Sequence, residues 1–357
     1  MPEARKQSRG VGFWAMASAG VLLAGLLGLE PPAPENQRIR GMTLDARSAP
    51  PDAVLDDLQN LGVSHVAVIP YAFLRGDSLR FNPNVRWFSE SEDGAIELSG
   101  RLADRGIELV IKPQVWLGQS GFPGDLDFDS VDGWERFEGQ YREYILHHAR
   151  VATRAGSTWF VLGTELARSA IERPEFWRGL AREVRTVFPG RLTYAANWWG
   201  EVDSLGFWEA FDAIGVQAYY PLSEARSPGT RELDEGWRPH RRRLAALSQR
   251  WNRPVVFTEL GYRSTADAAI KPWAWTSRSD SVGLDADLQA DLFRAFFGGP
   301  WTEPWMQGVF VWKWYGGPER DHWPRDFTPQ GKPAQSVILE GFRAASPPGS
   351  RPRSDGP

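Results

Sequence analysis

The chain of 357 residues contains no cysteine. This absence excludes a disulfide, a cysteine-ligated zinc site and a cysteine nucleophile, although it does not indicate a compartment. Histidine is also scarce, and no H-E-x-x-H motif occurs; the adjacent His147 and His148 would point to different faces of a helix. We therefore expect no bound metal and no cofactor. The histidines are His65, His147, His148, His240 and His322.

An excess of positive charge and the common phosphate motifs are missing as well. The net charge is −4, so composition does not favour a nucleic-acid partner. No G-x-S-x-G elbow and no G-x-G-x-x-G fingerprint occurs. Gly331 and Lys332 are followed by Pro333 rather than by Ser or Thr, which excludes a phosphate-binding loop there.

Long hydrophobic runs are absent except near the start. Val11 to Leu29 carries no charge and follows Arg5, Lys6 and Arg9. This pattern predicts either a cleaved export signal or a single uncleaved membrane anchor within residues 1–34, since no clear A-x-A cleavage site decides between them. A buried helix is a third interpretation. Both favoured interpretations place the rest of the chain outside the cytoplasm, with membrane contact only through this segment.

The far end of the chain is rich in Pro, Gly, Ser and Arg, so we expect residues 346–357 to be disordered. The remaining residues, 35–345, are expected to form one monomeric catalytic domain. An α/β barrel with insertions fits that length.

Short apolar runs recur along these residues and alternate with amphipathic segments. Helical spacing marks the segments 53–61, 134–155, 176–188 and 288–297, and Gly62 follows the first of them as a C-cap signal. Such alternation predicts a parallel sheet, and eight units predict a closed (β/α)8 barrel with its site at the C-terminal ends of the strands. An open doubly wound sheet is the alternative. The predicted strands are Arg38–Thr43, His65–Pro70, Glu108–Lys112, Trp159–Gly163, Leu192–Ala196, Ala213–Gln217, Val255–Thr258 and Gly308–Trp312.

The tripeptide Thr-Glu-Leu closes two of these runs, at Glu165 after the fourth strand and at Glu259 after the seventh. Two carboxylates delivered to one barrel mouth favour glycoside hydrolysis; hydrolysis with retention needs them about 5–5.5 Å apart. The chain's 18 tryptophans are in keeping with a sugar substrate, because indole faces stack on sugar rings.

This pattern resembles clan A glycoside hydrolases and, more narrowly, glycoside hydrolase family 113, a family of β-mannanases. The resemblance covers roughly residues 38–342 and rests on four segments. It implies that Glu165 is the acid/base and Glu259 the nucleophile. The segments are 160–166, 254–264, 309–314 and 327–334.

One departure concerns the residue before the acid/base. Most clan A members have Asn there, bonded to the sugar 2-hydroxyl, whereas this chain has Thr164. The resemblance implies that a residue other than Asn at this position fits family 113. It does not indicate which residue of this chain contacts the sugar 2-hydroxyl.

Other strand ends supply expected sugar contacts. The resemblance implies that Trp312 forms a platform under the attacked sugar, and either Tyr219 or Tyr220 is expected to donate a hydrogen bond to the nucleophile. Trp273 and Trp275 are possible cleft walls. The expected contact residues are Lys112, Gln114, Trp116, Asn197, Trp198, Gln217, Tyr219, Tyr220, Trp312 and Trp314.

These observations favour a retaining endo-β-1,4-mannanase or a related β-glycanase. The alternative is a membrane-tethered protein that binds or assembles polysaccharide on the same barrel without turnover. The exact polymer stays open among mannan, glucomannan, cellulose-type glucan and an exopolysaccharide, as does endo versus exo action.

Overall fold

The computed structural model describes residues 38–82, 85–118, 121–275, 281–318 and 323–344. The predicted leader, residues 1–34, and the predicted disordered tail, residues 346–357, lie outside the described residues. Across the described ranges, no helix is long and apolar enough to cross a membrane.

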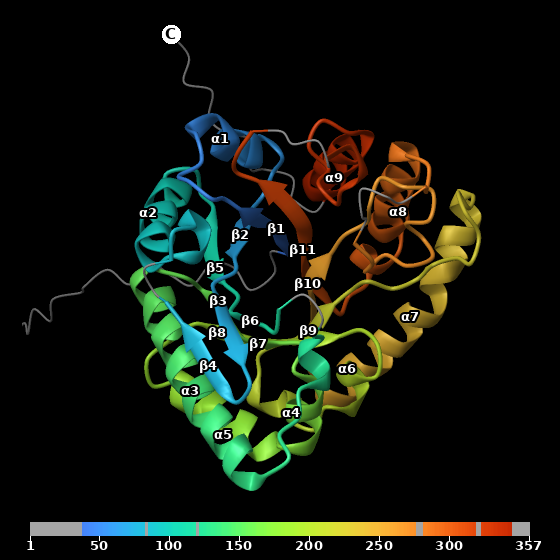
Figure 1. Cartoon of the computed structure of the whole chain (residues 1–357). Coiled ribbons are helices and arrows are strands. Elements are labelled where there is room, and N and C mark those ends of the chain that lie inside the picture. Colours follow the sequence, from blue (N-terminus) through green and yellow to red (C-terminus); the bar gives the residue numbers. More distant parts are fainter. Residues whose placement is uncertain (1–37, 83–84, 119–120, 276–280, 319–322, 345–357) are drawn as a thin grey trace, which may run out of the picture. The chain divides into compact units, whose positions relative to one another are not determined.

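Eight parallel strands close into a barrel, which confirms the predicted (β/α)8 fold and excludes the open sheet (Figure 1). Around the barrel the order is β1-β11-β10-β9-β8-β7-β5-β2. Each of these strands overlaps one of the eight predicted runs. They are β1 (Ile39–Asp45), β2 (His65–Val68), β5 (Glu108–Ile111), β7 (Trp159–Thr164), β8 (Arg191–Asn197), β9 (Ile214–Gln217), β10 (Val255–Leu260) and β11 (Met306–Tyr315).

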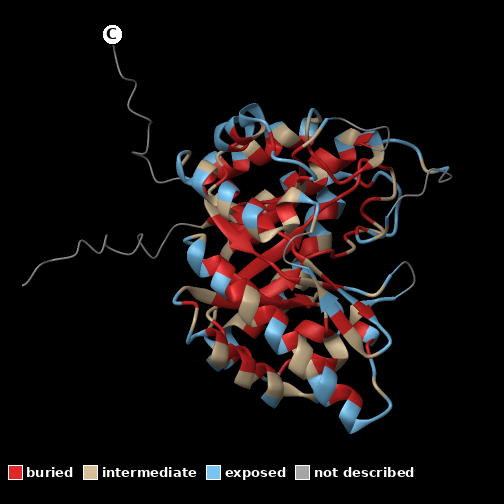
Figure 2. Ribbon diagram, turned by 60° about the vertical axis from the view of Figure 1, so that its left-hand side comes forward, coloured by how far each residue is buried: buried red, intermediate tan, exposed pale blue. Residues whose placement is uncertain are grey.

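The strands are buried on both faces, as their continuous apolar runs require, and they form the red centre of Figure 2. Inward-facing side chains fill the barrel, among them Val161, Val256 and Phe310. A larger cluster lies on the outer side of the strands, where the helices pack. Strand alternation thus separates the barrel filling from the helix interface.

Helices cover the outside of the barrel (Figure 1). The four predicted helical segments correspond to α1, α3, α5 and α8. Gly62 follows α1 with φ of 81°, a conformation that glycine adopts without a Cβ penalty. The α-helices are α1 (Asp52–Asn60), α2 (Glu92–Ala103), α3 (Val131–Arg154), α4 (Ala167–Glu172), α5 (Pro174–Val184), α6 (Glu201–Ser204), α7 (Thr230–Trp251), α8 (Ala286–Gly298) and α9 (Pro333–Ala344).

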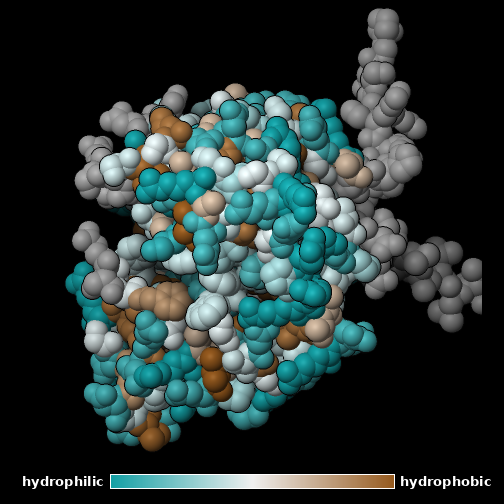
Figure 3. Space-filling view, turned by 90° about the vertical axis from the view of Figure 1, so that its right-hand side faces the viewer, coloured by the Kyte–Doolittle hydropathy of each residue, from teal (hydrophilic) through white to brown (hydrophobic). Residues whose placement is uncertain are grey.

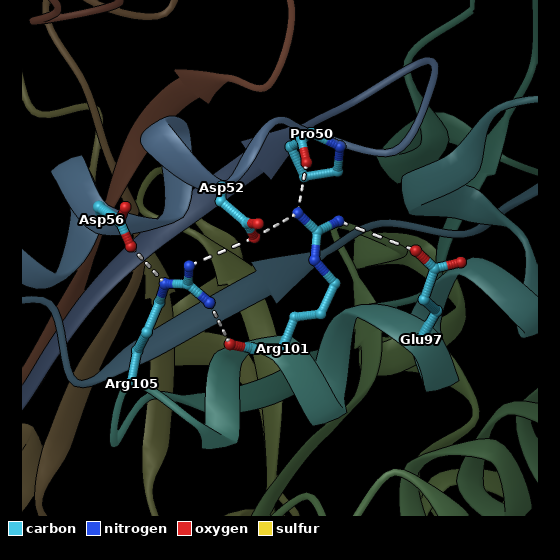
Figure 4. Close-up of polar contacts among 6 residues, drawn as sticks. All are labelled: Pro50, Asp52, Asp56, Glu97, Arg101 and Arg105. Carbon is cyan, nitrogen blue, oxygen red and sulfur yellow. Dashed lines mark hydrogen bonds and ion pairs between the residues drawn. The ribbon is translucent and has the colours of Figure 1, made fainter.

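Arg101 of α2 and Arg105, two residues after the end of α2, join this helix to α1 on the barrel exterior (Figure 4). Arg101 Nη2 lies 2.9 Å from Asp52 Oδ1, and Arg105 Nε lies 2.8 Å from Asp56 Oδ1. Arg101 also donates to the carbonyl of Pro50 at 2.6 Å. The two aspartates are well exposed, so these pairs orient the helices more than they stabilise the fold.

A small second sheet was not predicted. It has the order β4-β3-β6 and comprises β3 (Tyr71–Arg75), β4 (Ser78–Phe81) and β6 (Gln114–Trp116). Its hairpin turns on Gly76 and Asp77, a two-residue loop with Gly76 at φ of 61°. The Gly-Asp pair is a hairpin signal that the sequence carried. The sheet extends from the C-terminal ends of β2 and β5, beside the barrel mouth.

The remaining regular segments are short 3-10 helices in the connecting loops. They are η1 (Phe88–Glu90), η2 (Pro123–Asp125), η3 (Trp208–Ala210), η4 (Pro300–Thr302) and η5 (Trp323–Arg325). The face of the molecule in Figure 3 is mainly hydrophilic, with apolar side chains in separate spots.

Candidate active site

A cleft crosses the C-terminal mouth of the barrel and has two adjoining hollows of about 550 and 690 Å³. The larger hollow contains both predicted catalytic residues, Glu165 and Glu259. The other hollow lies over the ends of β1, β2 and β11. Four aromatic residues line both hollows, so the two form one continuous cleft: Tyr71, Trp116, Trp275 and Trp312.

Glu165 follows β7 directly and has φ of 52°, in the left-handed region that non-glycine residues rarely occupy. Such a conformation costs on the order of 1–3 kcal/mol and is typical of functional sites. The backbone N–H of Glu165 donates to the carbonyl of Ala195 at 2.9 Å, and Asn197 Nδ2 donates to Glu165 Oε1 at 2.8 Å. The neighbouring strand β8 therefore holds both the backbone and the carboxyl group of Glu165.

Burial, followed by the charge of Glu259, raises the pKa of Glu165 to about 7. The hydrogen bond from Asn197 and the charge of Lys112 oppose this shift. The ordinary pKa of this group is 4.5. Glu165 therefore stays protonated at pH values where an ordinary carboxyl group is ionised.

Glu259 lies on β10 in a contrasting environment, where three side chains donate to its carboxylate. Tyr219 OH donates to Oε2 at 2.5 Å, and Gln114 Nε2 donates to Oε1 at 3.2 Å. The ammonium of Lys112 forms a buried ion pair with Oε1. Three donors, one of them cationic, stabilise the charged form of a carboxylate and fix its orientation.

Lys112 lies beneath the cleft rather than on its wall, with its side chain 1% exposed. Its ammonium also lies 3.4 Å from Gln217 Oε1, and Gln217 Oε1 accepts from Thr258 Oγ1 at 2.9 Å. Burial lowers the pKa of Lys112, while the charges of Glu259 and Glu165 oppose that shift. Lys112 therefore interacts with the carboxyl groups of the site and not with the cleft itself, whereas Gln217 lines the cleft.

The exposed tryptophans gather at this cleft. Among the described residues, all five exposed tryptophans line at least one of the two hollows, whereas Trp177, Trp208 and Trp237 are fully buried in the core. Trp198 and Trp273 lie side by side, with ring centroids 5.6 Å apart. The exposed tryptophans are Trp87, Trp116, Trp199, Trp273 and Trp275.

The cleft thus brings together most of the predicted contact residues. Its lining includes Gln114, Trp116, Asn197, Trp198, Gln217, Tyr219 and Trp312.

Three predicted contact residues do not line the cleft, which corrects that part of the prediction: Lys112, which lies beneath it, Tyr220 and Trp314. Tyr220 points away from the cleft and packs against His240, with ring centroids 4.3 Å apart, because its neighbour Tyr219 points in. Trp314 is 1% exposed in the core outside the barrel. The pairing of β11 with β1 shifts by one residue between Trp312 and Trp314, so the two tryptophans do not share a face.

Thr164 takes no part in the cleft. Its hydroxyl donates to the carbonyl of Pro113 at 3.3 Å, and its side chain is buried. An amide does reach the Glu165 carboxyl group, but it comes from Asn197 at the end of the next barrel strand.

Several residues of the site were not predicted. Asp45, Glu90 and Lys313 line the smaller hollow, where Lys313 Nζ lies 2.6 Å from Asp45 Oδ2. Burial, and then the charge of Asp45, raises the pKa of Glu90 to about 7. Behind Glu165 lies a further buried carboxyl group, Glu201. Burial raises its pKa, and the hydrogen bonds that it accepts from Tyr194 and Asn197 oppose this shift. Asp45, Glu90 and Glu201 belong to no recognisable motif. Lys313 lies in the segment 309–314 that carries the resemblance, but the sequence did not indicate a role for it.

In the part of the chain that the structure describes, no cluster of three or more His, Asp or Glu side chains has the arrangement of a metal site. The site consists of carboxyl groups, amides, aromatic rings and the ammonium groups of Lys112 and Lys313. Such groups bind sugars and transfer protons.

Comparison with known proteins agrees with this chemistry. The model of Glycoside Hydrolase Family 113 matches residues 47–328. Among solved structures, the family 113 β-mannanase AaManA from Alicyclobacillus acidocaldarius, in complex with ManMIm, is similar with a TM-score of 0.75 and 24% identity, covering 87% of this chain and 99% of that one. A complex structure of a family 113 β-1,4-mannanase is similar with a TM-score of 0.74 and 23% identity, covering 86% of this chain and 99% of that one.

More distant barrels are also similar. A β-glucuronidase from Faecalibacterium prausnitzii has a TM-score of 0.59 at 13% identity, covering 86% of this chain and 49% of that one. No curated protein sequence matches. The family match spans well over half of the sequence and includes the strands that carry both glutamates. The chain belongs to glycoside hydrolase family 113 and is a glycoside hydrolase.

Proposed function

We propose that this protein is a retaining β-mannanase in which Glu259 is the nucleophile and Glu165 the acid/base. The observation that carries the proposal is the unequal environment of the two carboxyl groups. Three donors surround Glu259, including the ammonium of Lys112, whereas Glu165 is buried beside one amide and has a pKa raised to about 7. One group is thereby suited to attack and the other to donate a proton.

In the first step, a carboxylate oxygen of Glu259 attacks the anomeric carbon and forms a glycosyl ester. The bond from that carbon to the leaving sugar oxygen breaks, and this oxygen takes the proton of Glu165. Asn197 remains bonded to Glu165 Oε1 and stabilises the carboxylate that results.

In the second step, a water molecule attacks the anomeric carbon from the side of Glu165. Glu165 takes a proton from the water, the ester bond to Glu259 breaks, and both carboxyl groups return to their starting states. Lys112, Gln114 and Tyr219 stabilise the negative charge of the Glu259 carboxylate when it forms again.

Mannose as the sugar is supported by the family and by the two mannanases of similar structure. A polymer is supported by the length of the cleft, because the second hollow adjoins the catalytic one and carries Trp87 as a further exposed aromatic surface. Indole rings along a cleft suit a chain of pyranose rings.

The test is a panel of β-mannan, glucomannan, cellulose-type glucan and other polysaccharides, with detection of reducing ends. Proton NMR of the first product identifies the anomer. We expect cleavage of mannan with retention, and loss of at least about 1,000-fold in activity for Glu165→Gln and for Glu259→Gln. The surface variant Glu340→Gln is the matched control.

An inverted product would contradict the double displacement. Binding of mannan without any product would instead favour a polysaccharide-binding protein on the same barrel.

We further propose that the barrel acts outside the cytoplasm, because residues 11–29 carry the pattern of an export signal or anchor. Fractionation of cells that express the full chain tests this. Recovery of the protein in the cytoplasmic fraction alone would contradict it.

A further inference from the structure

Glu201 is a buried carboxyl group that touches neither hollow of the cleft. It begins the short helix α6, four residues after Asn197, and its residue is only 1% exposed. A buried carboxyl group needs hydrogen-bond partners to offset the loss of water. Glu201 has two, and both of them lead to Glu165.

The first connection runs through a tyrosine. Tyr194 OH donates to Glu201 Oε1 at 2.5 Å, and the same hydroxyl oxygen accepts the backbone N–H of Leu166 at 2.8 Å. Because a phenol has one proton, donation to Glu201 leaves its oxygen free to accept from Leu166. Glu201 therefore determines which way the hydroxyl of Tyr194 points, and Leu166 directly follows Glu165.

The second connection runs through an asparagine. Glu201 Oε2 accepts the backbone N–H of Asn197 at 2.6 Å, and the side chain of Asn197 donates to Glu165 Oε1 at 2.8 Å. Asn197 Oδ1 accepts the N–H of Trp199 at 2.8 Å, which fixes the orientation of its amide. One carboxyl group thus anchors the residue that binds Glu165.

We propose that Glu201 is a positioning residue for the acid/base Glu165. Through Tyr194 it holds the backbone beside Glu165, and through Asn197 it holds the amide on the Glu165 carboxyl group. The left-handed backbone of Glu165, with φ of 52°, is a conformation that persists only where neighbouring contacts impose it. This inference rests on the proposed role of Glu165 in protonating the leaving group.

A substitution at Glu201 has a specific consequence for this network. In Glu201→Gln, the amide oxygen must accept the backbone N–H of Asn197, because that N–H needs an acceptor. The NH2 group of the new side chain then faces Tyr194. The hydroxyl of Tyr194 then loses its acceptor. Tyr194→Phe removes the hydroxyl itself and therefore both of its hydrogen bonds, to Leu166 and to Glu201.

The test compares leaving groups on aryl β-mannobiosides. A 2,4-dinitrophenolate leaves without protonation, whereas phenolate needs the proton of Glu165. We expect Glu201→Gln to lower kcat/KM for the phenyl substrate by about 10- to 100-fold and to leave that for the dinitrophenyl substrate within about threefold. Because the second step needs Glu165 as a base, kcat for the dinitrophenyl substrate should fall, and added azide, which attacks without a base, should restore it.

Tyr194→Phe should give the same pattern, and it keeps the test decisive if Glu201→Gln does not fold. Tyr141→Phe is the matched control, since Tyr141 is a buried tyrosine whose hydroxyl donates to Leu162 of the same strand β7 at 3.0 Å without reaching Glu165. It should show no dependence on the leaving group.

Equal losses on both substrates in Glu201→Gln and Tyr194→Phe would mean a structural role and would overturn the inference. Wild-type protein that cleaves neither substrate would overturn the proposed function first and the inference with it.

Discussion

The hydroxyl of Tyr219 donates to Oε2 of Glu259 at 2.5 Å, while Lys112 and Gln114 occupy the other carboxylate oxygen. Lys112 and Gln114 lie two positions apart after β5, whereas Tyr219 comes from a distant segment, after β9. Together they leave Glu259 a single orientation, directed into the cleft.

Removal of the Tyr219 hydroxyl is the first prediction. A hydrogen bond to a charged group contributes about 1.5–3 kcal/mol, so Tyr219→Phe should lower kcat/KM by about 10- to 100-fold. Steady-state kinetics on mannan oligosaccharides measure this. Tyr220→Phe is the control, because the Tyr220 hydroxyl has no hydrogen-bond partner among the residues that the structure describes and its ring faces the core. Equal losses in the two variants would contradict the assignment.

Removal of the Lys112 ammonium is the second. Lys112→Met leaves Glu259 buried without its cation, and breaking a buried ion pair typically costs about 3–5 kcal/mol of unfolding free energy. Urea denaturation measures the loss. The double variant Lys112→Met with Glu259→Gln should regain part of it, since no uncompensated charge is then buried. A double variant less stable than Lys112→Met would count against this pairing.

The third prediction concerns activity and pH. Burial and the charge of Glu259 raise the pKa of Glu165 to about 7, and only the protonated form donates to the leaving group. The value of kcat/KM should therefore decline as pH rises through about 7. A profile measured from pH 4 to 9 checks this, and one that stays level up to pH 9 would be incompatible with it.

The fourth uses the same group to predict stability. Because the pKa of Glu165 is raised by folding from 4.5 to about 7, its contribution is fully present below about pH 4.5 and is lost as pH rises through about 7. Glu165→Gln removes this dependence. Between pH 4.5 and 8 the variant should lose about 1–3 kcal/mol less unfolding free energy than the wild type.

Urea denaturation at the two pH values measures the difference. Glu340→Gln, on the exposed face of α9, should behave like the wild type. No difference between Glu165→Gln and the wild type would show that Glu165 titrates alike in the folded and unfolded chains.

The fifth separates two neighbouring tryptophans. Trp312 lines both hollows, so Trp312→Ala should lower kcat/KM by about tenfold or more while the protein stays folded. Trp314 is buried outside the barrel, so Trp314→Ala should instead cost about 3–5 kcal/mol of unfolding free energy. Kinetics and thermal melting of both variants check this. A large loss of stability in Trp312→Ala together with a loss of activity alone in Trp314→Ala would contradict the assignment.

Much of the fold was predictable because its signals are local. Apolar runs such as Val255–Phe257 have no polar face, which favours strands covered on both sides, and the intervening segments repeat at helical spacing. The β3–β4 hairpin was missed, although Gly76 and Asp77 mark it, because it interrupts the strand–helix alternation on which the prediction depended.

The site was predictable to a smaller extent. Thr-Glu-Leu at two strand ends singled out Glu165 and Glu259, and their arrival in one cleft follows from the barrel rule. Whether their carboxyl groups lie about 5–5.5 Å apart stays a prediction. Glu201 escaped notice because a lone acid after a strand usually has no special role.

The sequence by itself determined the barrel and the placement of two glutamates at its mouth, since periodicity and strand order suffice for both. The tertiary structure decided which of the candidate side chains act with them and added others, such as Glu201, that the sequence did not indicate. Lys112 meets Glu259 across 147 positions, and a one-residue shift in the pairing of β11 sends Trp312 into the cleft and Trp314 into the core. Contacts between distant segments and register shifts depend on the packing of the whole barrel, which no local pattern records.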